Sequence, residues 1–137
     1  MAVVVDASVA MGWLLGSQAS VLSHAVEETI TTNGGWVPAH FGIEIARTLR
    51  RFERRGELTP DIVDQALAQM QELPLRQDTL AGFSSLRTGV KLARLHLLRI
   101  ADAAYLELAL RLELPLATRD RKLATAAARA GAKLFMP

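Results

Sequence analysis

Short apolar runs alternate along the chain with longer segments in which apolar side chains recur every three or four positions. The first run, residues 2–6 (AVVVD), has the composition of a strand buried on both faces, yet it ends in the carboxylate of Asp6. Further short strands are predicted at residues 36–38, 73–76, 115–118 and 133–136. Because helical segments separate these runs, the pattern predicts a three-layer α/β domain with a parallel sheet of four to five short strands flanked by helices.

The helical segments are predicted from period and from start and stop signals at residues 7–15, 17–32, 40–55, 59–72, 78–95, 99–112 and 120–130. The segment 99–112 is apolar on almost all sides, which predicts deep burial. Asp78 or Thr79 is the predicted N-cap of its helix. The inner face of that helix is expected to carry Phe83, Leu86, Val90, Ala93 and Leu97.

Length and composition fit one domain spanning residues 1–137. Half of the residues are hydrophobic and 22% are charged, which excludes a disordered chain. The absence of cysteine excludes disulfides and thiolate metal sites and makes the cytoplasm the simplest location. Acidic or basic residues interrupt every apolar stretch before the roughly 18 residues of a membrane span, so no membrane association and no signal peptide are expected.

Four acidic residues fall where a parallel sheet collects its ligands, beyond the carboxyl ends of the strands. Asp6 ends the first strand and Asp120 follows the strand 115–118. Glu44 is expected in the first turns of a helix, and Asp102 near the start of the buried one. Each acid alone has a simpler explanation, as an N-cap for the first two or as a complement to a helix dipole for the others.

Together the acids are harder to explain without a cation, since carboxylates within about 4 Å repel by roughly 4 kcal/mol per pair at an effective dielectric near 20. Oxygen ligands without cysteine favour a hard ion such as Mg²⁺ or Mn²⁺. His24, His40 and His96 lack metal-binding spacing and are expected at the surface or at the rim of the site.

Three stretches resemble PIN-domain proteins, and more narrowly VapC-type toxins of toxin-antitoxin pairs. They are VVVDASV at the start, VPAHFGIEIARTLRR in the second block and IADAAYLELALRLELPLATRDRKLA in the third, and the closing AGAKLF extends the likeness over nearly the whole chain. The third block is the most specific, because it joins an Asp-Ala-Ala-Tyr helix to a strand that ends in Thr-x-Asp.

The resemblance implies a single PIN domain that cuts RNA with one or two Mg²⁺ or Mn²⁺ ions and leaves a 3'-hydroxyl and a 5'-phosphate. The family's acidic quartet falls on Asp6, Glu44, Asp102 and Asp120. Its supporting hydroxyl residues fall on Ser8 and Thr118, although an ordinary helix start and strand end explain these equally well. Some relatives carry a further acid after the last aspartate, where this chain has Arg121 and Lys122, which argues against a strong second metal site.

A basic helix face accompanies the acids. Arg47, Arg51 and Arg55 share a face with Glu44 at four-residue spacing, and Arg119 lies beside the predicted site. This face is a candidate for RNA binding, for antitoxin binding, or for solvent exposure alone. The three larger aromatic residues, Trp13, Trp36 and Tyr105, are expected to be structural.

The predicted function is therefore a metal-dependent endoribonuclease, the toxin of a type II toxin-antitoxin pair. The resemblance also implies a homodimer and a small antitoxin partner that covers the acidic site. Two alternatives stay open: a housekeeping PIN nuclease for RNA processing without an antitoxin, and a non-catalytic α/β binding module whose acids are structural.

Overall fold

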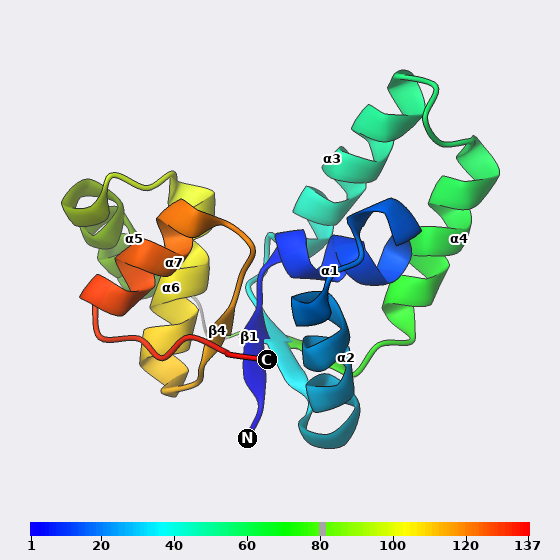
Figure 1. Cartoon of the computed structure of the whole chain (residues 1–137). Helices are drawn as coiled ribbons and strands as arrows, with labels where there is room; N and C mark the ends of the chain where they lie inside the picture. The colour runs from blue at the N-terminus through cyan, green and yellow to red at the C-terminus, as the bar shows by residue number, and fades with distance from the viewer. Residues whose placement is uncertain (80–81) are drawn as a thin grey trace.

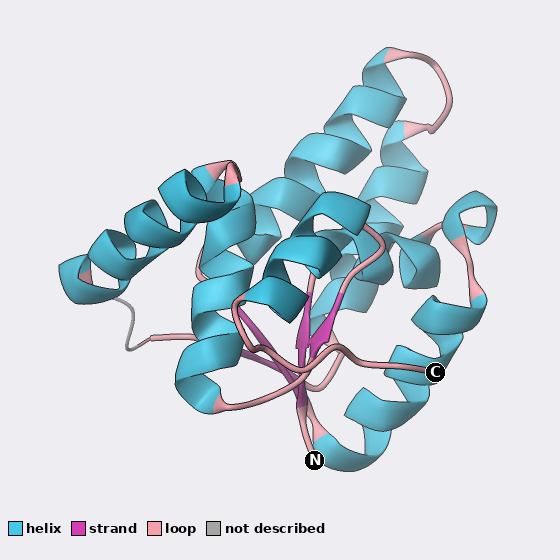
Figure 2. Ribbon diagram, turned by 60° about the vertical axis from the view of Figure 1, so that its left-hand side comes forward, coloured by secondary structure: helices cyan, strands magenta, loops and turns pink. Residues whose placement is uncertain are grey.

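A computed structural model describes residues 1–79 and 82–137 as a sheet between two groups of helices (Figure 1, Figure 2). The strands are β1 (Val3–Val5), β2 (Gly35–Val37), β3 (Leu75–Gln77) and β4 (Leu116–Ala117). All pairs are parallel, in the order β3-β2-β1-β4, with Val4 opposite both Trp36 and Leu116. The predicted strand at residues 133–136 is only a single parallel bridge between Leu116 and Leu134, so the sheet has four strands.

The helices are α1 (Ala7–Leu14), α2 (Val21–Asn33), α3 (Phe41–Arg54), α4 (Pro60–Gln71), α5 (Phe83–His96), α6 (Ile100–Leu112) and α7 (Arg121–Arg129), with a 3₁₀ turn η1 (Gly16–Gln18) after α1. Helices α1 to α4 lie on one side of β1, and α5 to α7 lie on the other (Figure 1). The predicted helix at 17–32 begins later than expected, because Ser20 and Ser23 form a capping box that starts α2 at Val21.

The start of α5 also differs from the prediction. Its N-cap is Gly82, not Asp78 or Thr79. The Asp78 side chain is instead buried against Arg111, whose Nη2 donates a hydrogen bond of 2.5 Å to it. Residues 80 and 81, which the predicted helix included, lie outside the described residues.

The predicted inner face of α5 is wrong in part. Phe83, Leu86 and Leu97 are 84%, 50% and 75% exposed, and the buried residues of this helix are Gly89 and Ala93. The residues that α5 buries are small, and its larger apolar side chains point outward.

Helix α6 is buried as predicted, with Leu106 0% and Leu108 1% exposed. Strand β1 is covered on both faces, and each of its valines is 0% exposed. Trp13 has a structural role, because its Nε1 donates to the Ser23 carbonyl oxygen at 2.7 Å and ties α1 to α2. Among the described helices, none is both long enough and apolar enough to cross a membrane.

Candidate functional site: an acidic cavity at the sheet edge

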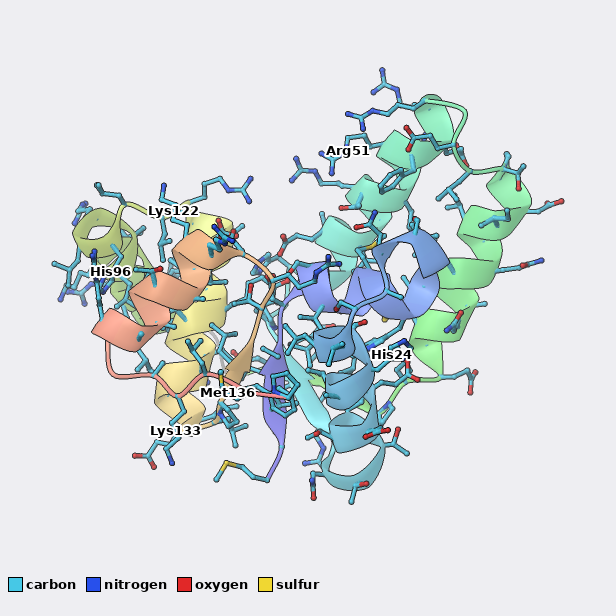
Figure 3. The ribbon with its side chains drawn as sticks, viewed as in Figure 1. His24, Arg51, His96, Lys122, Lys133 and Met136 are labelled. Carbon is cyan, nitrogen blue, oxygen red and sulfur yellow. The ribbon has the colours of Figure 1, made fainter. Side chains whose placement is uncertain are left out.

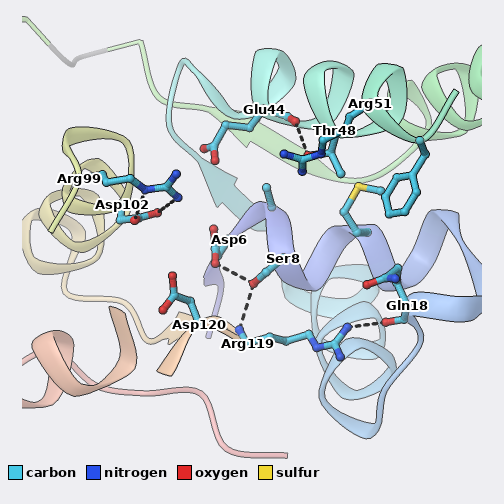
Figure 4. Close-up of a pocket in the computed structure, with 13 residues that line it drawn as sticks. Asp6, Ser8, Gln18, Glu44, Thr48, Arg51, Arg99, Asp102, Arg119 and Asp120 are labelled. Atoms are coloured by element: carbon cyan, nitrogen blue, oxygen red, sulfur yellow. Dashed lines mark hydrogen bonds and ion pairs between the residues drawn. The ribbon is translucent and has the colours of Figure 1, made fainter. Parts of the chain in front are cut away.

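The four predicted acids line one cavity of about 450 Å³ at the carboxyl edge of the sheet (Figure 4). They come from the end of β1 (Asp6), the first turn of α3 (Glu44), the first turn of α6 (Asp102) and the N-cap of α7 (Asp120). The parallel order places β1 beside both β2 and β4, so the segments that follow these three strands meet at one edge.

Asp6 is the most enclosed part of this site, with 5% of its surface exposed. Its Oδ2 accepts hydrogen bonds from Ser8 Oγ at 2.7 Å and from Thr118 Oγ1 at 2.6 Å. Although Asp6 stands at the N-cap of α1, its side chain makes no capping hydrogen bond, so the N-cap explanation fails for it. Burial raises the pKa of Asp6 against the lowering effect of the two hydroxyls, and the charges of Glu44 and Asp102 raise it further.

Asp120 does act as a helix cap. Its Oδ1 accepts from the backbone N–H groups of Lys122 at 2.9 Å and Leu123 at 3.2 Å. The predicted capping role is thus confirmed for this acid, which also faces the cavity.

The two supporting hydroxyls tie the β4–α7 loop to the end of β1. Ser8 Oγ donates to Asp6 and accepts from the Arg119 backbone N–H at 3.0 Å. Thr118 Oγ1 donates to Asp6 and accepts from the Asp120 backbone N–H at 3.0 Å. Each hydroxyl therefore uses its donor and an acceptor lone pair, which fixes the Asp6 carboxylate relative to Asp120.

Glu44 is held by two aromatic side chains. The buried Tyr105 hydroxyl donates to its Oε1 at 2.7 Å, and His40 Nε2 lies 2.8 Å from the same oxygen. Burial alone would raise the pKa of Glu44, but the contacts with His40 and Tyr105 outweigh it and lower the pKa. The sequence interpretation of Tyr105 as structural missed this contact. Its position three residues after Asp102, on the same side of the helix, was the available signal.

Asp102 is paired with Arg99, a residue absent from the predicted site. Arg99 Nε lies 3.1 Å from Oδ2 of Asp102 and Nη2 lies 3.4 Å from Oδ1. The hydrogen bond to Asp102 raises the pKa of Arg99, and the charges of Glu44 and Asp120 act in the same direction. The guanidinium therefore faces three of the four acids.

Two of the four predicted basic residues line the cavity, and two do not. Arg51 and Arg119 belong to its lining, whereas Arg47 on α3 and Arg55 just after that helix are exposed and lie outside it. Arg51 projects from α3 (Figure 3). Arg119 reaches from the β4–α7 loop to η1, where its Nη1 donates to the Gln18 carbonyl oxygen at 2.6 Å (Figure 4).

Comparison with known proteins decides the family. A sequence model described as "PIN domain" matches residues 3–129. The chain belongs to the PIN-domain family. Ribonuclease VapC3 of Mycobacterium tuberculosis is 39% identical to this PIN protein over 124 residues, which are 90% of this chain and 86% of the relative. The resemblance to VapC-type proteins is confirmed.

Solved structures confirm the PIN fold. PAE2754 from Pyrobaculum aerophilum matches with a TM-score of 0.69 at 20% identity, over 92% of this chain and 84% of that one. FitAcB from Neisseria gonorrhoeae matches with a TM-score of 0.69 at 15% identity, over 98% of this chain and 97% of that one. At such low identities these likenesses establish the three-layer fold alone.

The side chains that line the acidic cavity carry the type of ligand atom that a hard divalent cation prefers. These atoms are carboxylate oxygens, and one of them belongs to Asp6, a buried acid whose described partners are hydroxyls and not cations. Within residues 1–79 and 82–137, however, no three acids or histidines stand close enough together to form a ready metal site. Holding one ion would thus require the carboxylates to move closer together, and Arg99 would compete with the ion for Asp102.

Proposed function

We propose that this PIN domain is a metal-dependent endoribonuclease that hydrolyses phosphodiester bonds in RNA with Mg²⁺ or Mn²⁺. The observation that carries the proposal is the convergence of four carboxylates from four separate elements on one cavity. The 39% identity to a ribonuclease over 90% of the chain supports RNA as the substrate.

The metal ligands in this proposal are Asp6, Asp102 and Asp120, and Glu44 binds through water or orients the attacking water. A bound divalent ion would supply a nucleophilic hydroxide and stabilise charge on the phosphate. Ser8 and Thr118 hold the Asp6 carboxylate in place, and Tyr105 does the same for Glu44.

The substrate phosphates are assigned to the arginines at the cavity. Arg51 and Arg119 line it, and a planar guanidinium suits a phosphate because it donates two parallel hydrogen bonds. Arg47 and Arg55 continue the exposed face of α3 and are assigned to the RNA further from the cut, or to the antitoxin. Cleavage is expected to leave a 3'-hydroxyl and a 5'-phosphate.

We further propose that the protein is the toxin of a toxin-antitoxin pair, as the VapC resemblance implies. A small antitoxin would then cover the acidic cavity and the chain would form a homodimer. Growth arrest on expression of the wild type, relieved by co-expression of the neighbouring reading frame, tests the toxin role. Arrest that no partner relieves, or normal growth despite cleavage in vitro, would favour the housekeeping nuclease. Sedimentation of the purified chain tests the dimer.

The deciding experiment incubates the purified protein, free of any partner, with total RNA and Mg²⁺ or Mn²⁺. Asp6→Asn and Asp102→Asn are expected to abolish cleavage, while Asp64→Asn, an exposed acid on α4, is the matched control and should retain it. EDTA should stop the wild type. Equal cleavage by all four proteins would show a contaminant, and absence of both metal binding and cleavage in the wild type would favour the non-catalytic binding module.

A further inference from the structure

A second cavity, separate from the acidic one, lies between the end of α5 and the exposed face of α7 and measures about 370 Å³. Its polar and basic lining residues are His96, Arg121, Lys122, Thr125 and Arg129. None of the described residues that line it is acidic. The four from α7 lie one to eight positions apart, at spacings that place them on one broad side of the helix.

The positive charge of this cavity has no neutralising partner in the described part of the chain. Among the described residues, three arginines elsewhere are in ion pairs: Arg50 with Glu53, Arg99 with Asp102, and Arg111 with Asp78 and Glu107. No ion pair is formed by the three cations of the cavity within residues 1–79 and 82–137. Three unpaired cations around a concave surface produce a positive potential that attracts an anion.

His96 adds an independent indication of a ligand. Its Nε2 atom is shielded from solvent and, among the described residues, has no hydrogen-bond partner. Buried polar atoms without a partner are uncommon, and a ligand that completes the hydrogen bond is one physical explanation. Because that atom is shielded, the imidazole ring would have to turn before Nε2 could donate to a phosphate oxygen in the cavity. Beside it Leu97, 75% exposed, offers an apolar edge to a ribose or a base.

The basic cavity also lies close enough to the acidic cavity for one RNA strand to reach both. Helix α7 begins directly after its cap Asp120, which lines the acidic cavity. At about 1.5 Å per residue, Arg129 lies roughly 13 Å further along the helix axis than Asp120. Figure 3 shows Lys122 near the start of α7 and His96 toward its other end. A strand that passes over the acids can therefore continue along α7 within a few nucleotides.

We propose that this basic cavity binds a backbone phosphate of the RNA strand whose scissile bond lies over the acids. This inference rests on the proposed ribonuclease function. Single-stranded nucleic acid is commonly held by a positively charged groove that follows its backbone, and the cavity extends such a groove from the cut. An acidic polypeptide could satisfy the same charges, but the direct continuation from Asp120 favours the strand that is cut.

The test measures the affinity of a fluorescent 12-nucleotide oligouridylate for the cleavage-deficient Asp6→Asn protein between 50 and 200 mM salt. Adding Arg121→Gln and Arg129→Gln should weaken binding several-fold. The double change should also reduce the slope of log K against log salt by about 0.7, the value for the loss of one phosphate contact with a single strand. Arg121→Lys with Arg129→Lys keeps both charges and should retain most of the slope.

The matched control removes two exposed charges elsewhere, with Arg76→Gln on β3 and Lys133→Gln near the C-terminus. An equal loss of affinity and slope in the control and in the cavity variant would overturn the proposal, because net charge would then explain both. Displacement of the RNA by polyglutamate in the control protein but not in the cavity variant would reassign the cavity to an acidic polypeptide. A shift of the His96 Nε2 NMR signal on addition of oligouridylate is the expected second readout, and its absence would count against the site.

The two proposals fail in different ways. If the wild type cleaves no RNA with Mg²⁺ or Mn²⁺ but the cavity variants still weaken RNA binding, the ribonuclease proposal is wrong and the binding-site proposal stands. If the wild type cleaves RNA with metal but the cavity variants bind RNA as the control does, the binding-site proposal is wrong and the ribonuclease proposal stands.

Discussion

Arg99 lies across the carboxylate of Asp102, with its Nε 3.1 Å from Oδ2 and its Nη2 3.4 Å from Oδ1. The Arg99 side chain is 79% exposed, whereas that of Asp102 is 12% exposed. The charge of Asp102, a proposed metal ligand, is thus already neutralised by Arg99, whose exposed side chain is free to turn into solvent. A divalent ion that binds Asp102 would compete with the guanidinium for this carboxylate.

Removal of this competing charge should tighten metal binding. An exposed ion pair contributes up to about 1 kcal/mol, so Arg99→Gln is expected to lower the dissociation constant for Mn²⁺ by about two- to fivefold. Isothermal titration calorimetry at pH 7 measures it. Arg47→Gln loses the same charge from an exposed position outside the cavity and should change the constant little. Unchanged or weaker Mn²⁺ binding by Arg99→Gln would show that Arg99 does not compete.

The buried carboxylate of Asp6 should make the metal-free protein less stable as the pH rises. Burial raises the pKa of Asp6 above its ordinary value of 3.8, so between these two pKa values the folded chain binds the proton more tightly than the unfolded chain. The free energy of unfolding therefore falls as the pH rises through that window. In EDTA, Asp6→Asn should be stabilised by about 1 kcal/mol at pH 7 and by less near pH 4. Urea denaturation at both values measures it.

Added metal should reverse the stability difference between the wild type and Asp6→Asn. Mn²⁺ is expected to raise the melting temperature of the wild type and to leave Asp6→Asn nearly unchanged, because the variant lacks a central ligand. Asp64→Asn, which is exposed, should follow the wild type in both respects. If Asp6→Asn were no more stable than Asp64→Asn in EDTA, the prediction would be wrong, because burial of the Asp6 charge would not lower the free energy of unfolding.

The hydroxyl of Tyr105 should matter for Glu44 beyond its packing. Tyr105 is 0% exposed and donates to Oε1 of Glu44 at 2.7 Å. Tyr105→Phe keeps the ring and removes one hydrogen bond to a charged group, which should cost about 1.5–3 kcal/mol of stability. Cleavage should also fall, though less than in Glu44→Gln, and Mn²⁺ affinity should decrease.

The comparison with another change separates positioning from stability. Leu108→Ala removes buried apolar volume from the same helix, away from the acids, at a cost of about 2–5 kcal/mol. Under conditions where both variants are folded, Leu108→Ala should cleave RNA at the wild-type rate. Equal cleavage by the wild type and Tyr105→Phe would limit the hydroxyl to a structural role.

The acidic edge was predictable because it follows from chain order. A run such as Val3–Val5 that ends in Asp6 identifies a buried parallel strand, and parallel strands bring their carboxyl ends together. Asp6, Glu44 and Asp120 could therefore be placed at this edge without knowledge of which strands are neighbours, and Asp102 was singled out by its position near the start of the buried helix. From the sequence, an ordinary helix start and strand end explained Ser8 and Thr118 as well as a supporting role did. The structure adds that both hydroxyls donate to the Asp6 carboxylate.

What the sequence could not predict depends on tertiary packing. Asp78 has the features of a helix N-cap, but Arg111 of a distant helix binds it, and no local pattern encodes that contact. The outward position of Phe83 and Leu97 has a similar cause, because the spacing of apolar residues does not reveal that α5 buries its small residues, Gly89 and Ala93. Arg99 was missed since a basic residue before a helix is usually solvated.

The ion pairs of Arg111 should stabilise the fold without taking part in cleavage. Its guanidinium binds Glu107 through Nε at 2.9 Å and Asp78 through Nη2 at 2.5 Å, and these acids are 6% and 4% exposed. Their hydrogen bonds raise the pKa of Arg111. Arg111→Met would leave two buried carboxylates without this cation, at an expected cost of about 3–5 kcal/mol, whereas exposed Arg54→Met should cost little.

A triple change tests whether unpaired charge causes that loss. Combining Arg111→Met with Asp78→Asn and Glu107→Gln removes the buried charges together, and urea denaturation should show that much of the lost stability returns. Cleavage by the folded triple variant should equal that of the wild type, because none of the three side chains lines the acidic cavity. A triple variant no more stable than Arg111→Met would mean that the packing of the Arg111 side chain, and not its charge, stabilises this side of the sheet.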